Sequence, residues 1–334
     1  ASLCCLLFWG CKQATHFQMQ LEHMNELESI IYVEGQAKIL LLPIQESADE
    51  SLLQIESGDG NKIMQTLDVH MAVDSIDYFV PLDLDNYRQG SGETIMIRMK
   101  GLYNNAVTWD AIELVDTFDT TNRETFRPIY HHTPLYGWMN DANGLVYKDG
   151  EYHLYFQYNP YGSVWGNMHW GHSVSKDLMH WEHKAPVIAR DSLGHIFSGS
   201  SVVDVENTAG YGAGAIIAFY TSASEKNGQI QCMAYSKDNG YTYTKYEKNP
   251  ILTPFDGIKD FRDPKVFWYN PEKKWIMIVS ADKEMRFYAS YNLKDWTYLS
   301  AWGEGYGVQP RQFECPDMVQ LPVNGNKDYM KWVM

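Results

Sequence analysis

The chain has 334 residues, of which 45% are hydrophobic and 14% aromatic, enough apolar material for a large folded core. Its formal net charge of −15 argues against nucleic acid and other polyanions as partners, because those ligands require clustered Lys and Arg. The 11 Trp and 23 Tyr residues suit neutral ligands such as sugars, whose apolar C–H faces stack on aromatic rings.

Residues 1–19 open with a short apolar run, "ASLCCLLFWGC", that polar residues follow. This pattern is typical of the end of a bacterial lipoprotein signal, in which the Cys after a small residue is lipidated. We therefore expect lipidation at Cys11, with a plain secretory signal or a fortuitous apolar start as the alternatives. The run is too short to span a bilayer, so any membrane attachment is expected through the lipid alone. The protein is predicted to be an outer-membrane or periplasmic lipoprotein of the bacterial cell envelope, or to be secreted.

Residues 20–122 alternate apolar and polar side chains in short runs that turn residues separate, as in "HMAVDSIDYFVPLDL". This period-two pattern predicts a small antiparallel β-sandwich-like domain. The segment holds no cluster of polar residues typical of a functional site, so the sequence does not indicate what this domain does.

Residues 127–334 predict a β-propeller. The segments "HSVSKDLMHWEHK", "AYSKDNGYTYTKYEK" and "ASYNLKDWTYLSAW" repeat at roughly 55 to 60 residues, a period that is typical of propeller blades. The dipeptide Asp149-Gly150 between two alternating runs predicts a hairpin turn. The expected fold class is all-β: the N-terminal sandwich, then a five-bladed propeller of which this chain supplies three to four blades. We expect the propeller to be incomplete at the C-terminus, and the 334-residue chain alone to be insoluble or inactive.

Three acidic residues stand in similar surroundings: Asp141 in "GWMNDANG", Asp263 in "DFRDPKVFW" and Glu314 in "QFECPDMVQL". Each lies at the start of a β run that would be the innermost strand of a blade, so the three carboxylates should face one central funnel. Two carboxyl groups about 5 Å apart serve a retaining glycosidase, whereas a wider separation admits a water and gives inversion. One of the pair must stay protonated near neutral pH, which crowding and partial burial favour.

The segments "WMNDANG", "FRDP" and "ECPD" resemble the signature motifs of glycoside hydrolase family 32, which comprises invertases, inulinases and levanases. Three further segments resemble family segments in the same order: "FQYNP", "WGNMHWGHSVSKDL" and "FSGS". Ala142 stands where the family's first motif usually has Pro, a change that leaves the acidic residue and both Asn in place. The front half resembles, more weakly, the β-rich domain that precedes the propeller in some bacterial lipoprotein enzymes of this family.

The resemblance implies a role for each motif residue. Asp141 would be the nucleophile that attacks a fructofuranosyl unit, and Glu314 would be the acid/base. Asp263 would hold fructose hydroxyls and stabilise the transition state, and Arg262 would fix the carboxylates through charge-assisted hydrogen bonds. The fructose subsite would be lined by Asn140, Gln157, Trp165 and Ser198.

The function that these residues favour is a retaining glycoside hydrolase that cleaves β-fructofuranosidic bonds in inulin, levan or sucrose by double displacement. The alternatives are a fructosyltransferase with the same triad and a non-catalytic fructan-binding propeller. An arabinanase-type propeller hydrolase would share the fold but lacks "WMNDANG". We expect no cofactor and no metal, because the His residues show no ligand spacing backed by a second cluster. Cys315 is expected to pack beside Glu314 and tune it.

Overall fold

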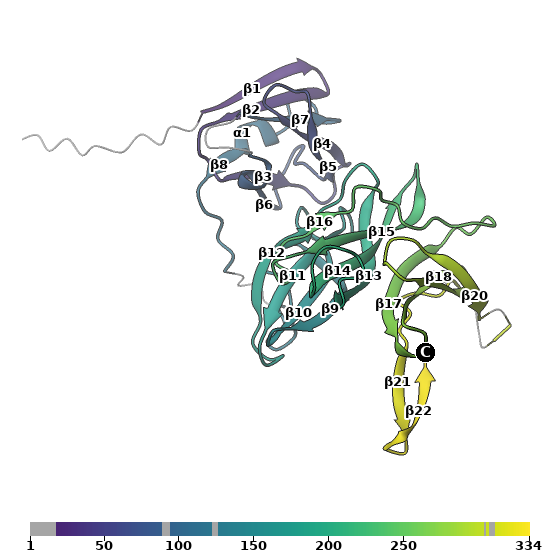
Figure 1. The fold of residues 1–334 in the computed structure, drawn as a ribbon. Coiled ribbons are helices and arrows are strands. Elements are labelled where there is room, and N and C mark those ends of the chain that lie inside the picture. The colour runs from purple at the N-terminus through teal and green to yellow at the C-terminus, as the bar shows by residue number, and fades with distance from the viewer. Residues whose placement is uncertain (1–17, 89–93, 122–125, 304, 307–310) are drawn as a thin grey trace, which may run out of the picture. The chain divides into compact units, whose positions relative to one another are not determined.

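The structure, a computed structural model, describes residues 18–88, 94–121, 126–303, 305–306 and 311–334 (Figure 1). The chain divides into two compact units, with the boundary between Asp119 and Thr120. The predicted lipidation site, Cys11, lies outside the described residues, and the first strand begins at Gln18. Within the described part of the chain, no helix has the length and apolar character needed to cross a membrane.

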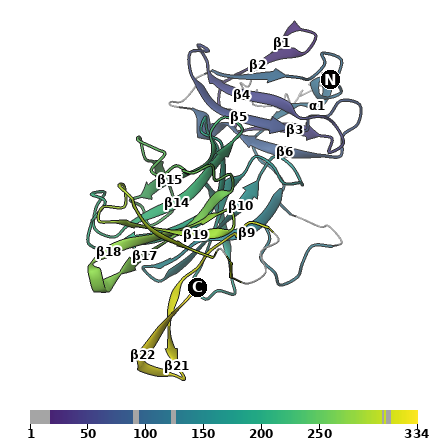
Figure 2. The ribbon, with the colours of Figure 1, turned by 90° about the vertical axis from the view of Figure 1, so that its right-hand side faces the viewer.

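In the part that the structure describes, the first unit is built from two antiparallel sheets, as the alternating pattern predicts (Figure 2). Along the strands, fully buried Leu and Ile residues alternate with more exposed ones, as Leu53 and Ile55 do, because successive side chains point to opposite faces. The five-stranded sheet has the order β1 (Gln18–Asn25), β2 (Glu28–Glu34), β7 (Ile95–Lys100), β4 (Ser51–Ser57), β5 (Ile63–Val69). The three-stranded sheet has the order β6 (Tyr78–Asp83), β3 (Ile39–Ile44), β8 (Glu113–Val115). Among its described residues the unit also has two one-turn helices, η1 (Leu84–Tyr87) and α1 (Thr108–Ala111).

The described residues of the second unit form three four-stranded antiparallel sheets and one hairpin, which correspond to three propeller blades and the opening of a fourth. Blade 1 comprises β9 (Trp138–Lys148), β10 (Glu151–Asn159), β11 (His169–Ser175) and β12 (Glu182–Ile188). Blade 2 comprises β13 (His195–Asp204), β14 (Ala215–Ser224), β15 (Gly228–Ser236) and β16 (Thr244–Lys245). Blade 3 comprises β17 (Phe261–Tyr269), β18 (Lys274–Ala281), β19 (Glu284–Ser290) and β20 (Thr297–Trp302), with the 3-10 turn η2 (Asn270–Glu272). The hairpin pairs β21 (Val319–Val323) with β22 (Asn326–Val333).

The three repeated segments form the turn between the third and fourth strand of each blade. In every blade a Ser hydroxyl at the start of this turn donates a hydrogen bond to the Asp or Asn two residues later, which closes the turn locally. The pairs are Ser175 with Asp177 at 3.2 Å, Ser236 with Asp238 at 2.7 Å, and Ser290 with Asn292 at 3.2 Å. The repeat in the sequence therefore arises because the same local turn occurs in each of the three blades.

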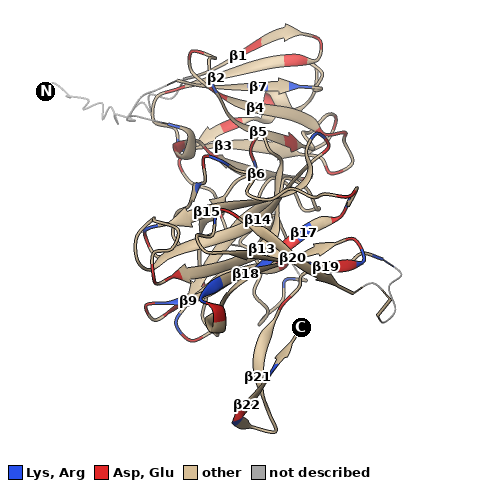
Figure 3. Ribbon diagram, turned by 45° about the vertical axis from the view of Figure 1, so that its right-hand side comes forward, with Lys and Arg blue, Asp and Glu red and all other residues tan. Residues whose placement is uncertain are grey.

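The hairpin that Asp149-Gly150 predicts joins β9 to β10. Both residues have positive φ angles, 50° and 88°, as a two-residue turn matching the strand twist requires. Figure 3 shows Asp and Glu spread over the strands and turns, interspersed with fewer Lys and Arg, as the net charge implies.

The first strands of the blades lie next to one another, with β13 in contact with both β9 and β17. The buried Ser200 hydroxyl on β13 joins two of them, because it donates to the carbonyl of Pro264 at 2.7 Å and accepts the N–H of Val266 at 2.9 Å. Neighbouring blades also share apolar cores, such as the one in which Phe219 and Met233 of blade 2 pack with Met277 of blade 3. Side chains at the starts of these strands are therefore brought to one place.

Candidate active site

One cavity of about 450 Å³ collects the residues that the motifs single out. All eight of the predicted catalytic and sugar-binding residues line it: Asn140, Asp141, Gln157, Trp165, Ser198, Arg262, Asp263 and Glu314. They come from β9, β10 and the loop after it, β13, β17 and the segment that precedes β21. Sequence reasoning missed Phe197, Gln229 and Asp260 as lining residues, and it treated Cys315 only as a packing residue.

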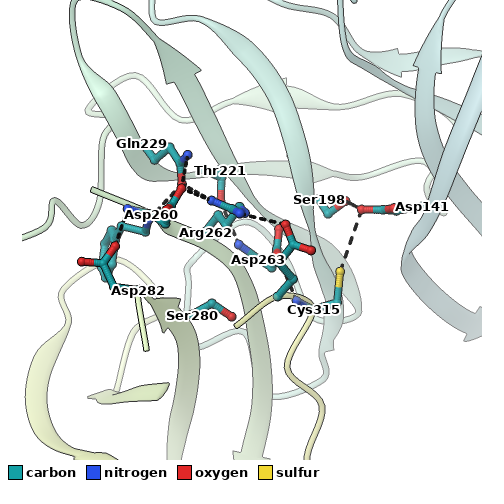
Figure 4. Close-up of polar contacts among 12 residues, drawn as sticks. Asp141, Ser198, Thr221, Gln229, Asp260, Arg262, Asp263, Ser280, Asp282 and Cys315 are labelled. Atoms are coloured by element: carbon teal, nitrogen blue, oxygen red, sulfur yellow. Dashed lines mark hydrogen bonds and ion pairs between the residues drawn. The ribbon is translucent and has the colours of Figure 1, made fainter. Parts of the chain in front are cut away.

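Asp141 lies on β9 and is exposed to the cavity. Its Oδ2 accepts a hydrogen bond from Ser198 Oγ at 2.7 Å, and the Cys315 thiol lies 3.9 Å from the same oxygen (Figure 4). The neighbouring Asn140 is oriented by the indole N–H of Trp138, which donates to Asn140 Oδ1 at 3.0 Å. The Trp of this motif therefore fixes the amide beside the carboxylate.

Asp263 is buried at the start of β17, only 6% exposed, and its φ angle of 63° is left-handed. Its N–H donates to Thr221 Oγ1 at 3.0 Å, and its Oδ2 accepts the backbone N–H of Cys315 at 2.9 Å. Burial raises the pKa of Asp263 to about 6; the Cys315 N–H and the Arg262 charge oppose this rise, and the nearby carboxylates add to it. Asp263 thus titrates close to neutral pH.

Arg262 lines the cavity, is only 9% exposed, and contacts three of the other lining residues. Its Nη2 donates to Glu314 Oε1 at 2.8 Å, and its Nη1 donates to Asp260 Oδ1 at 2.5 Å and to Gln229 Oε1 at 3.2 Å. A planar guanidinium can make these contacts at once because its donors point in fixed directions. Glu314 is itself solvent-exposed, so this ion pair orients the carboxylate more than it stabilises the fold.

Two buried amides add hydrogen-bonding capacity. Gln157 is 2% exposed and lines the cavity, and among the described residues its Nε2 has no hydrogen-bond partner. Asn143 of β9 is also buried, and neither of its amide atoms has a partner in the described part of the chain. An unpaired buried amide costs roughly 1–3 kcal/mol, so a donor such as Gln157 Nε2 is suited to a ligand hydroxyl.

An aromatic wall borders the cavity. Trp165 is 53% exposed, stacks on His195 with the ring centroids 6.1 Å apart, and meets the edge of Phe197 at 5.8 Å. Such a wall offers a flat apolar surface to a sugar ring. Among the residues that the structure describes, no group of three or more His, Cys, Asp or Glu is arranged to hold a metal ion.

The missed residues differ in whether the sequence carries a signal for them. Asp260 is part of "KDFRDP" and could have been recognised as a further carboxylate at the start of that β run. Gln229 lies on β15, the third strand of blade 2, and no signal in the sequence relates it to the motifs. Only the packing of blade 2 on blade 3 brings it to Arg262.

Two family models match the chain. The model described as "Glycosyl hydrolases family 32 N-terminal domain" matches residues 131–334, and the one described as "Domain of unknown function (DUF4980)" matches residues 25–130.

Several proteins are similar to part of this chain. A levanase of Bacillus subtilis is 53% identical over 214 residues, which are 63% of this chain and 31% of the levanase. Invertase 1 of Saccharomyces cerevisiae is 43% identical over 227 residues, which are 64% of this chain and 42% of the invertase. The crystal structure of an exo-inulinase from Aspergillus awamori aligns with a TM-score of 0.58 and 38% identity, over 64% of this chain and 46% of that one. The chain thus spans less than half the length of these relatives.

Proposed function

The chain belongs to glycoside hydrolase family 32, and we propose that it is a retaining hydrolase of β-fructofuranosidic bonds in fructans or sucrose. The observation that carries the proposal is the convergence of Asp141, Asp263 and Glu314 on one cavity around Arg262. The names of the relatives, levanase, exo-inulinase and invertase, support this substrate class.

In the first step, Asp141 attacks the anomeric carbon of the fructosyl unit while Glu314 protonates the departing glycosidic oxygen. Ser198 and the Cys315 thiol both approach Asp141 Oδ2, so Oδ1 is the oxygen that forms the bond. Arg262 occupies Glu314 Oε1, so Oε2 carries the proton. The product of this step is a covalent fructosyl–enzyme and a free leaving group.

In the second step, Glu314 takes a proton from a water molecule, which attacks the same carbon and releases fructose and Asp141. Two inversions at this carbon restore its configuration. Both steps pass through an oxocarbenium-like transition state that carries positive charge. Asp263, when ionised, stabilises that charge from within a buried site, where electrostatic interactions are strong.

The sugar is held by the remaining cavity residues. The unpaired Gln157 Nε2 and the amide of Asn140 bind fructose hydroxyls, and the exposed face of Trp165 contacts the apolar side of the sugar. Since the Asp263 Oδ2 atom already accepts from Cys315, its Oδ1 atom is the one that binds a hydroxyl.

The experiment that tests the proposal is product analysis of the purified full-length protein on inulin, levan and sucrose. We expect release of fructose, with the β-anomer appearing first in a time-resolved NMR spectrum. Saccharides longer than the substrate as the main products would identify a fructosyltransferase, and binding without turnover would identify a fructan-binding protein. First appearance of the α-anomer would contradict retention.

The domain limits and the lipid anchor are also proposals. We propose a catalytic domain of residues 127–334 after an N-terminal domain of residues 20–122, which the unit boundary and the family matches support. Lipidation of Cys11 at the cell envelope rests on the signal pattern alone. Incorporation of labelled palmitate in a bacterial host, and its loss in Cys11→Ser, would test it.

A further inference from the structure

A second cavity, of about 490 Å³, shares a wall with the catalytic cavity. The shared residue is Asp260, which lines both. Beyond Asp260, the second cavity is lined by residues of the β18–β19 turn and by the segment that leads to Glu314. Its other charged lining residues are Asp282, Lys283, Glu284, Arg286 and Arg311.

The second cavity lies on the Glu314 side of the catalytic site. The carbonyl of Asp282 accepts the N–H of Phe313, the residue before Glu314, at 2.8 Å. Asp282 Oδ1 also accepts the N–H of Asp260 at 2.8 Å, so one turn ties together the segments that carry Glu314 and Arg262. Figure 4 shows Asp260 and Asp282 on one side of Arg262 and Asp141 on the other.

The walls of this cavity are fixed rather than loose. Arg286 is only 5% exposed, and its Nε donates to Glu284 Oε1 at 2.7 Å. Its guanidinium lies 4.1 Å from the ring centroid of Phe255, which in turn contacts the edge of Tyr298 at 5.4 Å. A charged side chain held between Glu284 and Phe255 in this way presents its donors in a set direction.

The charge of the lining suits a neutral ligand with many hydroxyls. The lining holds three carboxylates and three cations, so neither an anion nor a cation is favoured overall; the carboxylates are Asp260, Asp282 and Glu284, and the cations are Lys283, Arg286 and Arg311. Carboxylates accept hydrogen bonds and Lys and Arg donate them, and sugar hydroxyls can do both.

We propose that the second cavity binds the sugar units on the leaving-group side of the scissile bond, so that the protein prefers oligomeric or polymeric fructan to a disaccharide. This inference rests on the proposed function, in which Glu314 protonates the oxygen that leaves. The single leaving sugar of sucrose reaches the shared wall at Asp260. The further units of a longer chain reach Lys283 and Arg311.

The test is a double variant, Lys283→Ala/Arg311→Ala. Both side chains are exposed, and neither lines the catalytic cavity. We expect kcat/KM on inulin or levan to fall about tenfold, the factor for losing one hydrogen bond to a charged group, while kcat/KM on sucrose changes less than about twofold. The polymer, inulin or levan, on which the double variant loses more kcat/KM is the preferred fructan. The matched control, Lys237→Ala/Lys248→Ala, removes two exposed cations that line neither cavity, and should have no effect.

Equal losses on sucrose and polymer, or no loss on either polymer, would overturn the inference. A binding measurement separates it from the proposed function, because it needs no turnover. In an Asp141→Ala background, calorimetry should show that the double variant weakens binding of a fructan oligosaccharide about tenfold but leaves the affinity for fructose unchanged. Unchanged oligosaccharide affinity would refute the role of the cavity even if the parent protein hydrolyses nothing.

Discussion

The backbone N–H of Cys315 donates to Oδ2 of Asp263 at 2.9 Å, and both residues have left-handed backbone, with φ angles of 47° and 63°. Non-glycine residues in this region cost about 1 kcal/mol or more, and such strain gathers at functional sites where the surrounding structure holds it in place. The bond joins the start of β17 to the segment before β21. It therefore positions a buried carboxylate from a neighbouring blade through the main chain.

The Cys315 side chain should matter less than its backbone. Burial, followed by the Asp263, Asp141 and Glu314 carboxylates, raises the pKa of the thiol to about 12, so it stays protonated and is no nucleophile. We expect Cys315→Ala, which keeps the N–H, to lower kcat less than about tenfold, because it removes only the weak contact between the thiol and Asp141 Oδ2 at 3.9 Å. Steady-state kinetics on sucrose would check this. A loss comparable to that of Asp141→Ala would mean that the thiol takes part in the chemistry.

Arg262→Lys should lower kcat severely although it keeps the positive charge. A single ammonium cannot contact Glu314 on one side and both Asp260 and Gln229 on the other. We expect kcat to fall about a hundredfold or more, as for loss of a preorganised charge contact, with a thermal unfolding midpoint close to that of the parent. Arg190→Lys, whose guanidinium bonds Asn167 outside the cavity, is the control. Parent-like kcat in Arg262→Lys would show that the guanidinium fork is dispensable.

Asp263 should make both activity and stability depend on pH. Its pKa is about 6 in the folded protein and near 3.8 when unfolded, so the folded state binds the proton more tightly. The stabilisation from its protonated form is present below pH 3.8 and lost as the pH rises through 6. Asp263→Asn should therefore be more stable than the parent at pH 8, by up to about 3 kcal/mol, with the difference vanishing at about pH 3.

The same variant should be inactive, and activity of the parent should decline below pH 6, because ionised Asp263 stabilises the transition state. Urea unfolding at the two pH values, together with a pH–rate profile, would measure these effects. An Asp263→Asn protein that is less stable than the parent at pH 8 would contradict the account of its burial.

Gly144 of "WMNDANG" should resist substitution for steric reasons. A Cβ at this position would lie 2.6 Å from the Trp170 ring and 2.9 Å from Tyr155, and the φ angle is 56°. We expect Gly144→Ala to destabilise by roughly 2–4 kcal/mol, the sum of overpacking and backbone strain. Gly150→Ala is the matched control, since it has a positive φ but nothing within 4 Å of the added carbon. Equal shifts in the unfolding midpoint for the two variants would exclude the steric explanation.

The features that could be predicted from the sequence are those that arise from interactions between residues close together in the chain. The repeated blade turns are visible because each closes within three residues, as Ser236 and Asp238 do. The cavity residues are visible because each motif brings its functional side chain together with the residues that orient it, as Trp138 orients Asn140. Gln229, the second cavity and the raised pKa of Asp263 depend on how blades pack, and no local pattern encodes that.

The central claim, that Asp141 forms a covalent bond to the sugar, is tested most directly by trapping. Glu314→Gln should slow the hydrolysis of the intermediate, because no base then activates the water. With an activated fructoside as substrate, tandem mass spectrometry of the quenched variant should find a fructosyl adduct on Asp141. An adduct on a different residue, or none during turnover that yields the α-anomer first, would contradict the account.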